Sequence, residues 1–400
     1  MKYVVLLADG ASDFPIASLG GKTPLEYADT PHMDWLAAHG RLGRFETTAP
    51  GLHAGSDTNN LNVMGFNPRA VYTGRSPLEA ASIGVEMRPG DVSFRCNLVT
   101  LGGPEGARAM EDYSGHDVKT EHSRAIMKAL QDRLGGGEFE FHPGVSYRNL
   151  LVWRGGEAKI RGIRTAAPHD ISDREIAPYL PSGPGSEVIR RFLEASWGII
   201  REASAGLEGC RANSAWFWGE GTKPAIPSFR DLTGLRGAVV SAVDLVKGIG
   251  RFAGMTVLEV EGATGWIDTN YEGKVAAALK ALEDHDYVFL HVEATDEAGH
   301  KGSVEQKVLA CEYFDRRVVR PVLEALPKFG AHRVLMTSDH PTPIELKTHV
   351  KDAVPFAYYD SEHPRVGPAR GYGETEAERS GVYYGNCRTL VGEFLNRTLD

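Results

Sequence analysis

The sequence predicts an α/β fold in which a mostly parallel sheet carries helices on both faces. Residues 288–292 and 334–337 are short apolar runs with β-branched side chains, as buried strands of a parallel sheet are. After residue 237, strand-like and helix-like segments alternate along the chain. That alternation is typical of consecutive strand-helix-strand units, so we expect one large sheet built from both ends of the chain.

The individual elements follow from local patterns. Residues 2–8 form an apolar strand that ends at Asp9 and Gly10. Residues 30–39 are typical of a helix with Thr30 as its cap and a proline in its first turn. In the carboxyl-terminal part we expect further strands at 238–241 and 257–260, and helices near Leu245 and over 273–283.

The middle of the chain has a different character. Between about residues 77 and 225 the strand and helix signals are mixed, and glycine pairs such as Gly102-Gly103 and Gly155-Gly156 interrupt them. We infer a smaller α+β cap domain over 77–222, inserted into a discontinuous main domain of 1–76 and 223–400. Each boundary follows from composition alone.

Composition limits the kinds of protein that this chain can be. The 400 residues are 42% hydrophobic and carry a formal charge of -9, which suits a large core and argues against nucleic acid binding. The 4 cysteines are scattered without a CxxC pair, so we expect reduced thiols and a cytoplasmic protein. No run approaches the roughly 20 apolar residues of a membrane span, and no signal peptide pattern is present.

Candidate chemistry begins with two residues near the amino terminus. Asp9 follows the first strand and could bind a metal, although Asp-Gly after a strand is also common in turns. Ser56, in Gly55-Ser56-Asp57, opens a helix after a loop with proline and glycine. A metal and the positive helix end could activate its hydroxyl, whereas the plain alternative is a helix N-cap.

The strongest candidates follow the late strands. Asp296 and His300 stand four residues apart, which puts a carboxylate and an imidazole on one side of a helical turn. Asp339, His340 and then His349 follow the next strand. Since open α/β sheets place their chemistry at the carboxyl ends of strands, these residues together predict a site with two metal ions.

These motifs resemble the cofactor-independent phosphoglycerate mutases of the archaeal type, which belong to the alkaline phosphatase superfamily. The likeness runs along essentially the whole chain. It also includes Gly20-Gly-Lys-Thr-Pro-Leu-Glu-Tyr-Ala-Asp-Thr-Pro31, Gly74-Arg75-Ser-Pro-Leu-Glu79, Glu261-Gly-Ala-Thr-Gly265 and Lys347-Thr-His349. The resemblance implies an alkaline-phosphatase-like main domain with an inserted substrate-binding cap.

The resemblance also implies residue roles. Ser56 would be the nucleophile that carries the phosphoryl group. One divalent ion would be held by Asp296, His300 and His349, and the other by Asp9, Asp339, His340 and the Ser56 oxygen. Mixed carboxylate and imidazole ligands suit Mn²⁺ or Zn²⁺, with Mg²⁺ as a further candidate, and no 2,3-bisphosphoglycerate would be needed.

Substrate contacts are expected mainly in the cap. The candidates are His116, Arg148, His169, Asp170 and Asn213, with Lys247 from the main domain. Each has a plain alternative, because an exposed charged side chain is usually solvated surface. His116 could shuttle a proton, but its Gly and Asp neighbours also suit a turn.

The implied reaction interconverts 3-phosphoglycerate and 2-phosphoglycerate, a small phosphorylated carboxylate, inside the cell and without a membrane or nucleic acid partner. Pro341 after His340, together with Ser241-Ala-Val-Asp244 and His291-Val-Glu293, is closer to a bacterial branch with proposed homoserine kinases. A homoserine kinase is therefore the second hypothesis. Phosphomonoester hydrolysis and metal binding without catalysis are the remaining ones, and the sequence does not predict an oligomeric state.

Overall fold

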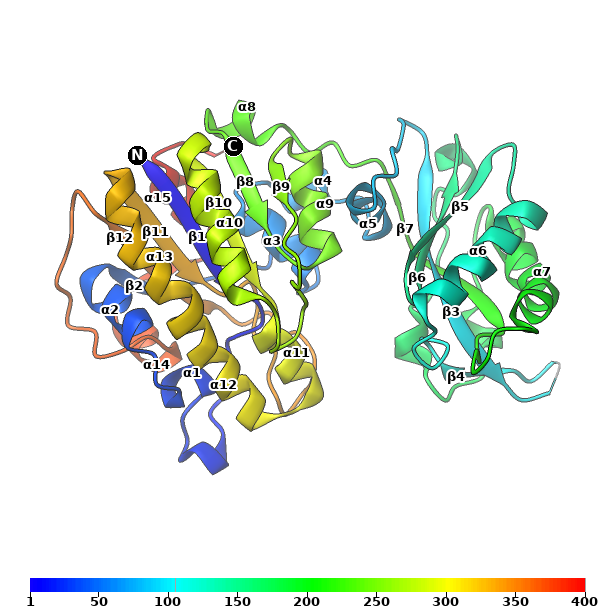
Figure 1. Cartoon of the computed structure of the whole chain (residues 1–400), viewed down its shortest axis with the longest axis horizontal. Helices are drawn as coiled ribbons and strands as arrows, with labels where there is room; N and C mark the ends of the chain where they lie inside the picture. The colour runs from blue at the N-terminus through cyan, green and yellow to red at the C-terminus, as the bar shows by residue number, and fades with distance from the viewer. Residues whose placement is uncertain (105, 400) are drawn as a thin grey trace. The chain divides into compact units, whose positions relative to one another are not determined.

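The chain folds into two compact units. The computed structural model describes residues 1–104 and 106–399. The first unit comprises Met1–Tyr72 and Ala225–Asp400, and the second comprises Thr73–Pro224. The second unit is therefore inserted into the first, as the colour order in Figure 1 also shows. Its role as a substrate-binding cap stays a prediction.

The first unit is built around an 8-stranded sheet in the order β13-β2-β12-β11-β1-β10-β8-β9. The pairs from β11 to β9 are parallel, while β12 runs antiparallel to both of its neighbours. The predicted α/β class with a mostly parallel sheet is thus confirmed. The strands are β1 (Lys2–Ala8), β2 (Arg41–Phe45), β8 (Gly237–Val240), β9 (Thr256–Leu258), β10 (Tyr287–Val292), β11 (His332–Thr337), β12 (Val354–Asp360) and β13 (Tyr383–Tyr384).

The central strand β1 explains why these segments are so apolar. It lies between β10 and β11, and Leu6 is in register with Leu290 on one side and Met336 on the other. All three side chains are buried. A strand that is covered on both faces has no side directed to water, so it needs a continuous apolar run.

Helices cover both faces of this sheet, as the sequence predicts. On one face, residues of α2 (Pro31–His39), α10 (Tyr271–Asp284) and α12 (Val304–Phe314) share a hydrophobic cluster with Val4, Leu6 and Leu290. On the other face, the Phe394 ring of α15 (Cys387–Leu395) packs edge-on against Tyr3 at 5.6 Å. Helix α3 (Ser56–Val63) packs against α15 and α9 (Asp244–Phe252).

The start of α2 differs from the prediction. Thr30 occupies the cap position, but its side chain makes no capping hydrogen bond. The Asp315 carboxylate instead accepts hydrogen bonds from the backbone N–H groups of His32 and Met33, at 2.9 and 2.7 Å. The first turn is therefore capped from another helix, because any acceptor that reaches the free N–H groups satisfies them.

Shorter helices complete the first unit. They include α1 (Pro24–Tyr27), α4 (Pro68–Val71), α8 (Phe229–Thr233), α11 (Ala294–Lys301), α13 (Arg320–Ala325) and α14 (Glu374–Arg379), with a π-helical turn at Asp315–Val319. No helix in the described part of the chain is long and apolar enough to cross a membrane. The cysteines are free thiols, and Cys96, Cys311 and Cys387 are buried.

The second unit has its own core. Its 5-stranded sheet is antiparallel in every pair and has β3 (Val92–Gly102) at its centre, with β4 (Ala109–Asp112), β5 (Phe139–Val145), β6 (Arg148–Trp153) and β7 (Ser214–Thr222). Helices α6 (Thr120–Leu134) and α7 (Ser186–Ser204) pack against each other and against this sheet, whereas α5 (Ser76–Ser82) contacts β3 and β7. Ile126, Leu130 and Phe192 lie in the shared cluster.

Glu374, the first residue of α14, joins two distant loops of the first unit. Its carboxylate accepts hydrogen bonds from the Asp13 backbone N–H at 3.1 Å and from the Thr23 hydroxyl at 2.6 Å. Removal from solvent raises the pKa of Glu374 from 4.5 to about 7. The folded state therefore holds this proton at pH values where the unfolded chain has released it.

This pKa predicts a pH dependence of stability. Because the folded pKa is raised, the free energy of unfolding falls as pH rises from about 4.5 to about 7, by at most roughly 3 kcal/mol from this one group. In Glu374→Gln that part of the slope should be absent, while the exposed control Glu283→Gln should keep it. Urea unfolding at a series of pH values measures the slope, and equal slopes in both variants would contradict the assignment.

Candidate metal centre

The loops after adjacent strands of the sheet converge at one edge. Strands β11, β1 and β10 are neighbours and parallel, so their carboxyl ends lie side by side. Asp9 directly follows β1, Asp339 and His340 follow β11, and Asp296 lies in α11 just after β10. Residues from distant parts of the sequence thereby meet at the point where strand order brings their loops together.

The first cluster contains Asp9, Asp339 and His340. Their ligand atoms all lie within 4.8 Å of one another, and all three residues are buried. His340 Nε2 is 3.6 Å from Asp9 Oδ1 and 3.3 Å from Asp339 Oδ2. Asp339 is further oriented by the Gly10 N–H at 3.1 Å and the Asn60 side-chain amide at 2.9 Å.

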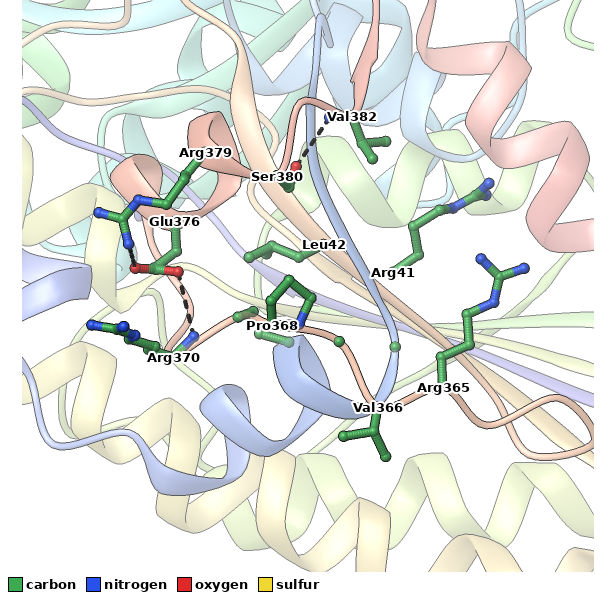
Figure 2. A pocket seen from close by; sticks show the side chains of 14 residues that line it. Arg41, Leu42, Arg365, Val366, Pro368, Arg370, Glu376, Arg379, Ser380 and Val382 are labelled. Carbon is green, nitrogen blue, oxygen red and sulfur yellow. Dashed lines mark hydrogen bonds and ion pairs between the residues drawn. The ribbon is translucent and has the colours of Figure 1, made fainter.

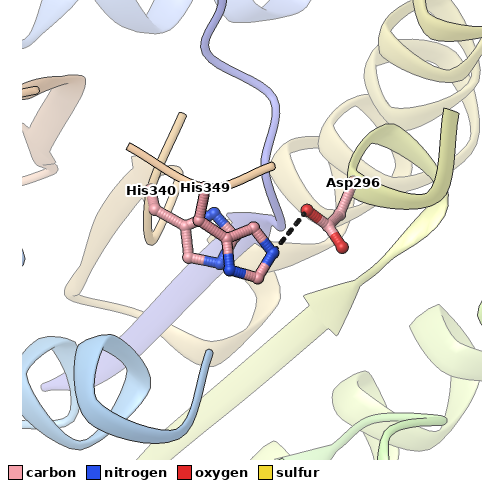
Figure 3. A group of neighbouring side chains, drawn as sticks. All are labelled: Asp296, His340 and His349. Atoms are coloured by element: carbon pink, nitrogen blue, oxygen red, sulfur yellow. Dashed lines mark ion pairs between the residues drawn. The ribbon is translucent and has the colours of Figure 1, made fainter. Parts of the chain in front are cut away.

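The second cluster contains Asp296, His340 and His349, with ligand atoms in the same mutual range. Figure 3 shows His349 directed at Asp296, with 3.5 Å between Nε2 and Oδ1, and the His340 ring beside it. The centroids of the two imidazoles are 3.9 Å apart. His300 adjoins this cluster, because its Nε2 lies 3.3 Å from Asp296 Oδ2 and 2.9 Å from His349 Nε2.

Ser56 lies against both clusters. It is the first residue of α3, and its Oγ is 3.3 Å from His340 Nε2. The N-cap position belongs to Gly55, and in the first turn it is the Asp57 carboxylate that accepts from the Thr58 N–H, at 2.9 Å. The alternative of Ser56 as an N-cap is therefore wrong, because its hydroxyl faces the metal-type ligands instead of the free N–H groups of its own helix.

The buried carboxylates of the site favour a bound cation. Burial, followed by repulsion from Asp339 and Asp296, raises the pKa of Asp9 well above its usual value. Both Asp9 carboxylate oxygens are buried without a hydrogen bond among the described residues, although the imidazoles of His291 and His340 lie 2.9 and 3.6 Å from them. Carboxylates in such surroundings are stabilised by a metal ion, so the residues present fit divalent cations.

His340 has the protonation that a metal ligand needs. Burial lowers the pKa of His340, which leaves its imidazole neutral near pH 7. Burial alone would raise the pKa of Asp296, but hydrogen bonds with His300 and His349 lower it well below the usual value. The Thr342 hydroxyl also donates to Asp296 Oδ1 at 2.5 Å. Oxygen and nitrogen donors without thiolate are typical of Mn²⁺ or Zn²⁺ sites.

His291 belongs to the site, although the sequence did not single it out as a site residue. It is fully buried in β10, and its Nε2 lies 2.9 Å from Asp9 Oδ2. The Ser241 hydroxyl lies 3.3 Å from His291 Nδ1 and itself accepts from the Val243 N–H. If the Ser241 hydroxyl donates to Nδ1, the ring proton of His291 is on Nε2, which faces Asp9 Oδ2 at 2.9 Å.

Burial also lowers the pKa of His291 to about 3, so the ring is neutral. The available sequence signal was a single polar residue inside the apolar run of β10. A lone histidine in such a run is usually structural, which is why the pattern by itself does not identify it.

The expected substrate residues of the second unit have local partners. His116 lies in a turn with φ of 56°, its N–H donates to the Asp112 carboxylate, and its ring is 3.4 Å from Glu111. The Asn213 amide both donates to and accepts from the backbone of Leu101, which ties β3 to the loop before β7. The contacts of His116 match its alternative as a turn residue. The contacts of Asn213 are those of a residue that holds two backbone segments together.

Arg148, His169 and Asp170 are exposed. The Arg148 guanidinium lies over the Tyr147 ring at 4.4 Å, and His169 packs edge-on against Trp218 at 5.2 Å. In the first unit, Lys247 forms an ion pair with Glu259 at 2.6 Å. Substrate binding by this set stays a prediction.

Gly10 allows the first loop to approach Asp296. Its φ is +59°, and an added Cβ would lie 2.5 Å from both Asp296 Oδ1 and Thr342 Oγ1. Gly10→Ala should therefore displace Asp296 and lower Mn²⁺ affinity, measured by equilibrium dialysis. Gly21→Ala is the matched control, since φ is +80° there but no atom lies within 4 Å. Equal metal affinity in the two variants would contradict an effect of the clash with Asp296.

The 2.9 Å contact of His291 with Asp9 predicts a loss of metal affinity in His291→Leu, which replaces the imidazole by an apolar side chain of similar size. Loss of a residue that supports a metal ligand typically weakens metal binding by about 10- to 100-fold. His291→Gln keeps a donor and should recover part of the affinity. His332→Gln, at a buried histidine of β11 bonded to the Gly330 carbonyl, is the control. Titration with Mn²⁺ followed by electron paramagnetic resonance measures each value, and wild-type affinity in His291→Leu would refute the role.

Comparisons with known proteins place the chain in a family. The family model described as 2,3-bisphosphoglycerate-independent phosphoglycerate mutase matches residues 37–205. The probable mutase of that name from Geobacter sulfurreducens is 50% identical over 99% of this chain and 100% of its own length. The mutase from Methanosarcina barkeri is 44% identical over 98% of each chain.

Solved structures agree with this placement. A protein from Pyrococcus horikoshii has a TM-score of 0.80 at 29% identity and covers 100% of this chain and 98% of its own. The cofactor-independent phosphoglycerate mutase from Thermoplasma acidophilum has a TM-score of 0.66 at 26% identity and covers 99% and 100%. With full-length relatives at this level of identity, the chain belongs to the 2,3-bisphosphoglycerate-independent phosphoglycerate mutase family.

Proposed function

We propose that this chain interconverts 3-phosphoglycerate and 2-phosphoglycerate through a phosphoserine at Ser56. The observation that carries the proposal is the position of the Ser56 hydroxyl, 3.3 Å from His340 at the edge of two buried Asp/His clusters. Relatives that share 50% and 44% of its residues along their whole length bear the mutase name. The enzyme class would be an isomerase that moves a phosphoryl group within one molecule.

The site would hold two divalent cations, Mn²⁺ or Zn²⁺, with Mg²⁺ as a further candidate. Asp296, His300 and His349 would hold one, and Asp9, Asp339, His340 and the Ser56 oxygen the other. His340 lies in both clusters, so it would adjoin both cations. When bound, the cations would lower the pKa of the serine hydroxyl and neutralise charge on the transferring phosphoryl group.

The residues of the chain supply positioning and a nucleophile. The Ser56 oxygen attacks the phosphorus of 3-phosphoglycerate, the bond from phosphorus to the C3 oxygen breaks, and that oxygen takes a proton as Ser56 gives one up. Glycerate then turns, its C2 oxygen attacks the phosphorus, the bond from phosphorus to Ser56 Oγ breaks, and Ser56 regains a proton as the C2 hydroxyl gives one up. The positive amino end of α3 favours the phosphoryl group on its first residue.

This cycle requires that glycerate stay bound while water is kept from the phosphoserine. We assign that task to the second unit, with the predicted contacts His116, Arg148, His169, Asp170 and Asn213, and with Lys247 in the first unit. No 2,3-bisphosphoglycerate takes part, because the phosphoryl group is held by the protein. A cytoplasmic location is part of the same proposal.

Pro341, the residue that pointed toward the kinase hypothesis, has a structural role. It forms isolated bridges with Ala11 and Ser12, and its carbonyl accepts from the Val350 N–H at 3.1 Å. Pro341 therefore connects the loops that carry Asp9 and His349, a role that fits a mutase and a kinase equally. The full-length relatives that bear the mutase name favour mutase activity, which is the function that we propose.

Ser56→Ala should lower mutase turnover by roughly 1,000-fold or more while Mn²⁺ still binds, because the nucleophile is lost and most ligands remain. Ser228→Ala, at the serine that caps α8, is the control and should retain activity. The assay uses purified, Mn²⁺-loaded protein and 3-phosphoglycerate without nucleotide. Mass spectrometry of acid-quenched wild type should show one phosphoryl group on the peptide with Ser56.

The same purified, Mn²⁺-loaded protein separates the remaining hypotheses when it is also given homoserine and ATP. Phosphorylation of homoserine by ATP without mutase turnover would establish the kinase and contradict our proposal. Release of inorganic phosphate with no 2-phosphoglycerate would indicate hydrolysis. Undiminished turnover in Ser56→Ala would exclude the serine route altogether.

A further inference from the structure

A cavity of about 460 Å³ lies at the edge of the large sheet, outside the metal centre. Its walls come from the end of α2, the first residues of β2, and the segment 365–382 that contains α14. We call it the β2 pocket. None of the described residues that line it belongs to either Asp/His cluster. Its size falls in the usual range for sites of small organic ligands.

The β2 pocket concentrates positive charge on a chain of net charge -9. Arg41, Arg365, Arg370 and Arg379 line it, and Glu376 is the only lining carboxylate among the described residues. Figure 2 shows Arg41 and Arg365 on one side, Arg370 and Arg379 with Glu376 on the other, and Leu42 and Pro368 between them. The pocket thus combines cationic sides with an apolar middle.

The arginines differ in how far they are already neutralised. Arg379 is paired with Glu376. Arg41 is held by Glu393 at 2.6 Å and lies over the rings of Tyr358 and Tyr384. The Arg41 Nε is nevertheless buried without a hydrogen-bond partner among the described residues.

The side chains of Arg365 and Arg370 are exposed and form no ion pair with a carboxylate in the described part of the chain. Their guanidinium groups therefore have the most N–H donors available to bind an anionic ligand. Arg41 adds a donor that is already held in place by its own contacts.

Backbone hydrogen bonds hold the walls in place. The Arg365 and Gly367 N–H groups donate to the carbonyls of His39 and Ala38, at 3.1 and 2.7 Å. The Arg370 N–H donates to the Glu376 carboxylate at 3.4 Å. The arginines therefore stand on a segment tied to α2, which lowers the entropy cost of arranging them around a ligand.

We propose that the β2 pocket binds an organic phosphate, which acts as an effector of the metal centre. A phosphate monoester presents three oxygens and two negative charges, enough for forked contacts with more than one guanidinium, whereas a carboxylate presents two oxygens and one charge. Leu42, Pro368 and neighbouring apolar atoms suit the organic part. Inorganic phosphate would use only the charged sides.

A short route leads from the pocket to the metal centre. Glu376 of the pocket lies in α14, and Glu374 at the start of the same helix accepts from the Asp13 N–H. The Asp13 carboxylate in turn accepts from the Ile344 N–H at 3.2 Å, in the loop between His340 and His349. A ligand that shifts α14 thereby acts on both loops of metal ligands, and coupling of this kind is reciprocal.

The test uses the full chain and adenosine 5′-monophosphate as the probe, with inorganic phosphate as the fragment without an apolar body. Calorimetry should show saturable binding that is tighter for the nucleotide than for phosphate. The double variant Arg365→Gln, Arg370→Gln should bind it about 10- to 100-fold more weakly, since two charge-assisted contacts are lost. Arg320→Gln, at an exposed arginine of α13 paired with Glu324, is the control.

The effector role is read from Mn²⁺ titrations with and without the probe, which do not depend on catalysis. A shift of Mn²⁺ affinity in wild type and in Arg320→Gln, absent from the double variant, is the expected result. Three results would overturn the proposal: no saturable binding, equal binding by the double variant and wild type, or an Mn²⁺ affinity unaffected by the probe. Because the readout is metal affinity, failure here leaves the mutase proposal standing, and failure of the mutase assay leaves this one standing.

Discussion

The structure of the first unit depends on one electrostatic constraint, the crowding of Asp9, Asp296 and Asp339 at the edge of a buried parallel sheet. All are almost completely removed from water, and Asp9 makes no hydrogen bond through either oxygen among the described residues, with the His291 ring as a close contact at 2.9 Å. Uncompensated charge of this kind is costly in a protein interior. Cations between the carboxylates and the imidazoles of His340 and His349 would relieve it.

Several other features follow from that constraint. Gly10 allows its loop to reach Asp296 without a side chain in the way, and its N–H also orients Asp339. Ser241 contacts His291, and His291 contacts Asp9, so these two residues support a metal ligand from behind. Ser56 gains its position from α3, which packs against α9 and α15 on one face of the sheet. Positioning of the nucleophile is thus a consequence of how the sheet is covered.

Much of the first unit could be predicted from sequence because its signals are local. A strand buried on both faces must be apolar, so the sequence shows where it ends. A metal ligand at its carboxyl end then follows within one or two residues, as Asp9 follows β1 and Asp339 follows β11. His291 was missed because its role comes from a partner far away in the sequence. The capping of α2 by Asp315, instead of Thr30, has the same cause.

Residues of the second unit were harder to assign for a different reason. Surface arginines and histidines, such as Arg148 and His169, carry no pattern that separates a substrate contact from solvated surface. The β2 pocket could not be predicted from the sequence either, because it is lined by residues near 40 and residues near 370. Only the fold brings these guanidinium groups together.

The number of cations per chain tests the account most directly, because the buried carboxylates form two clusters that share His340. Protein stripped of metal and reloaded with Mn²⁺ should be separated from free ion, and its metal content measured against the protein concentration by elemental analysis. We predict two Mn²⁺ ions per chain. Saturation at a single ion, or no retained metal, would contradict a centre built to hold two cations around His340.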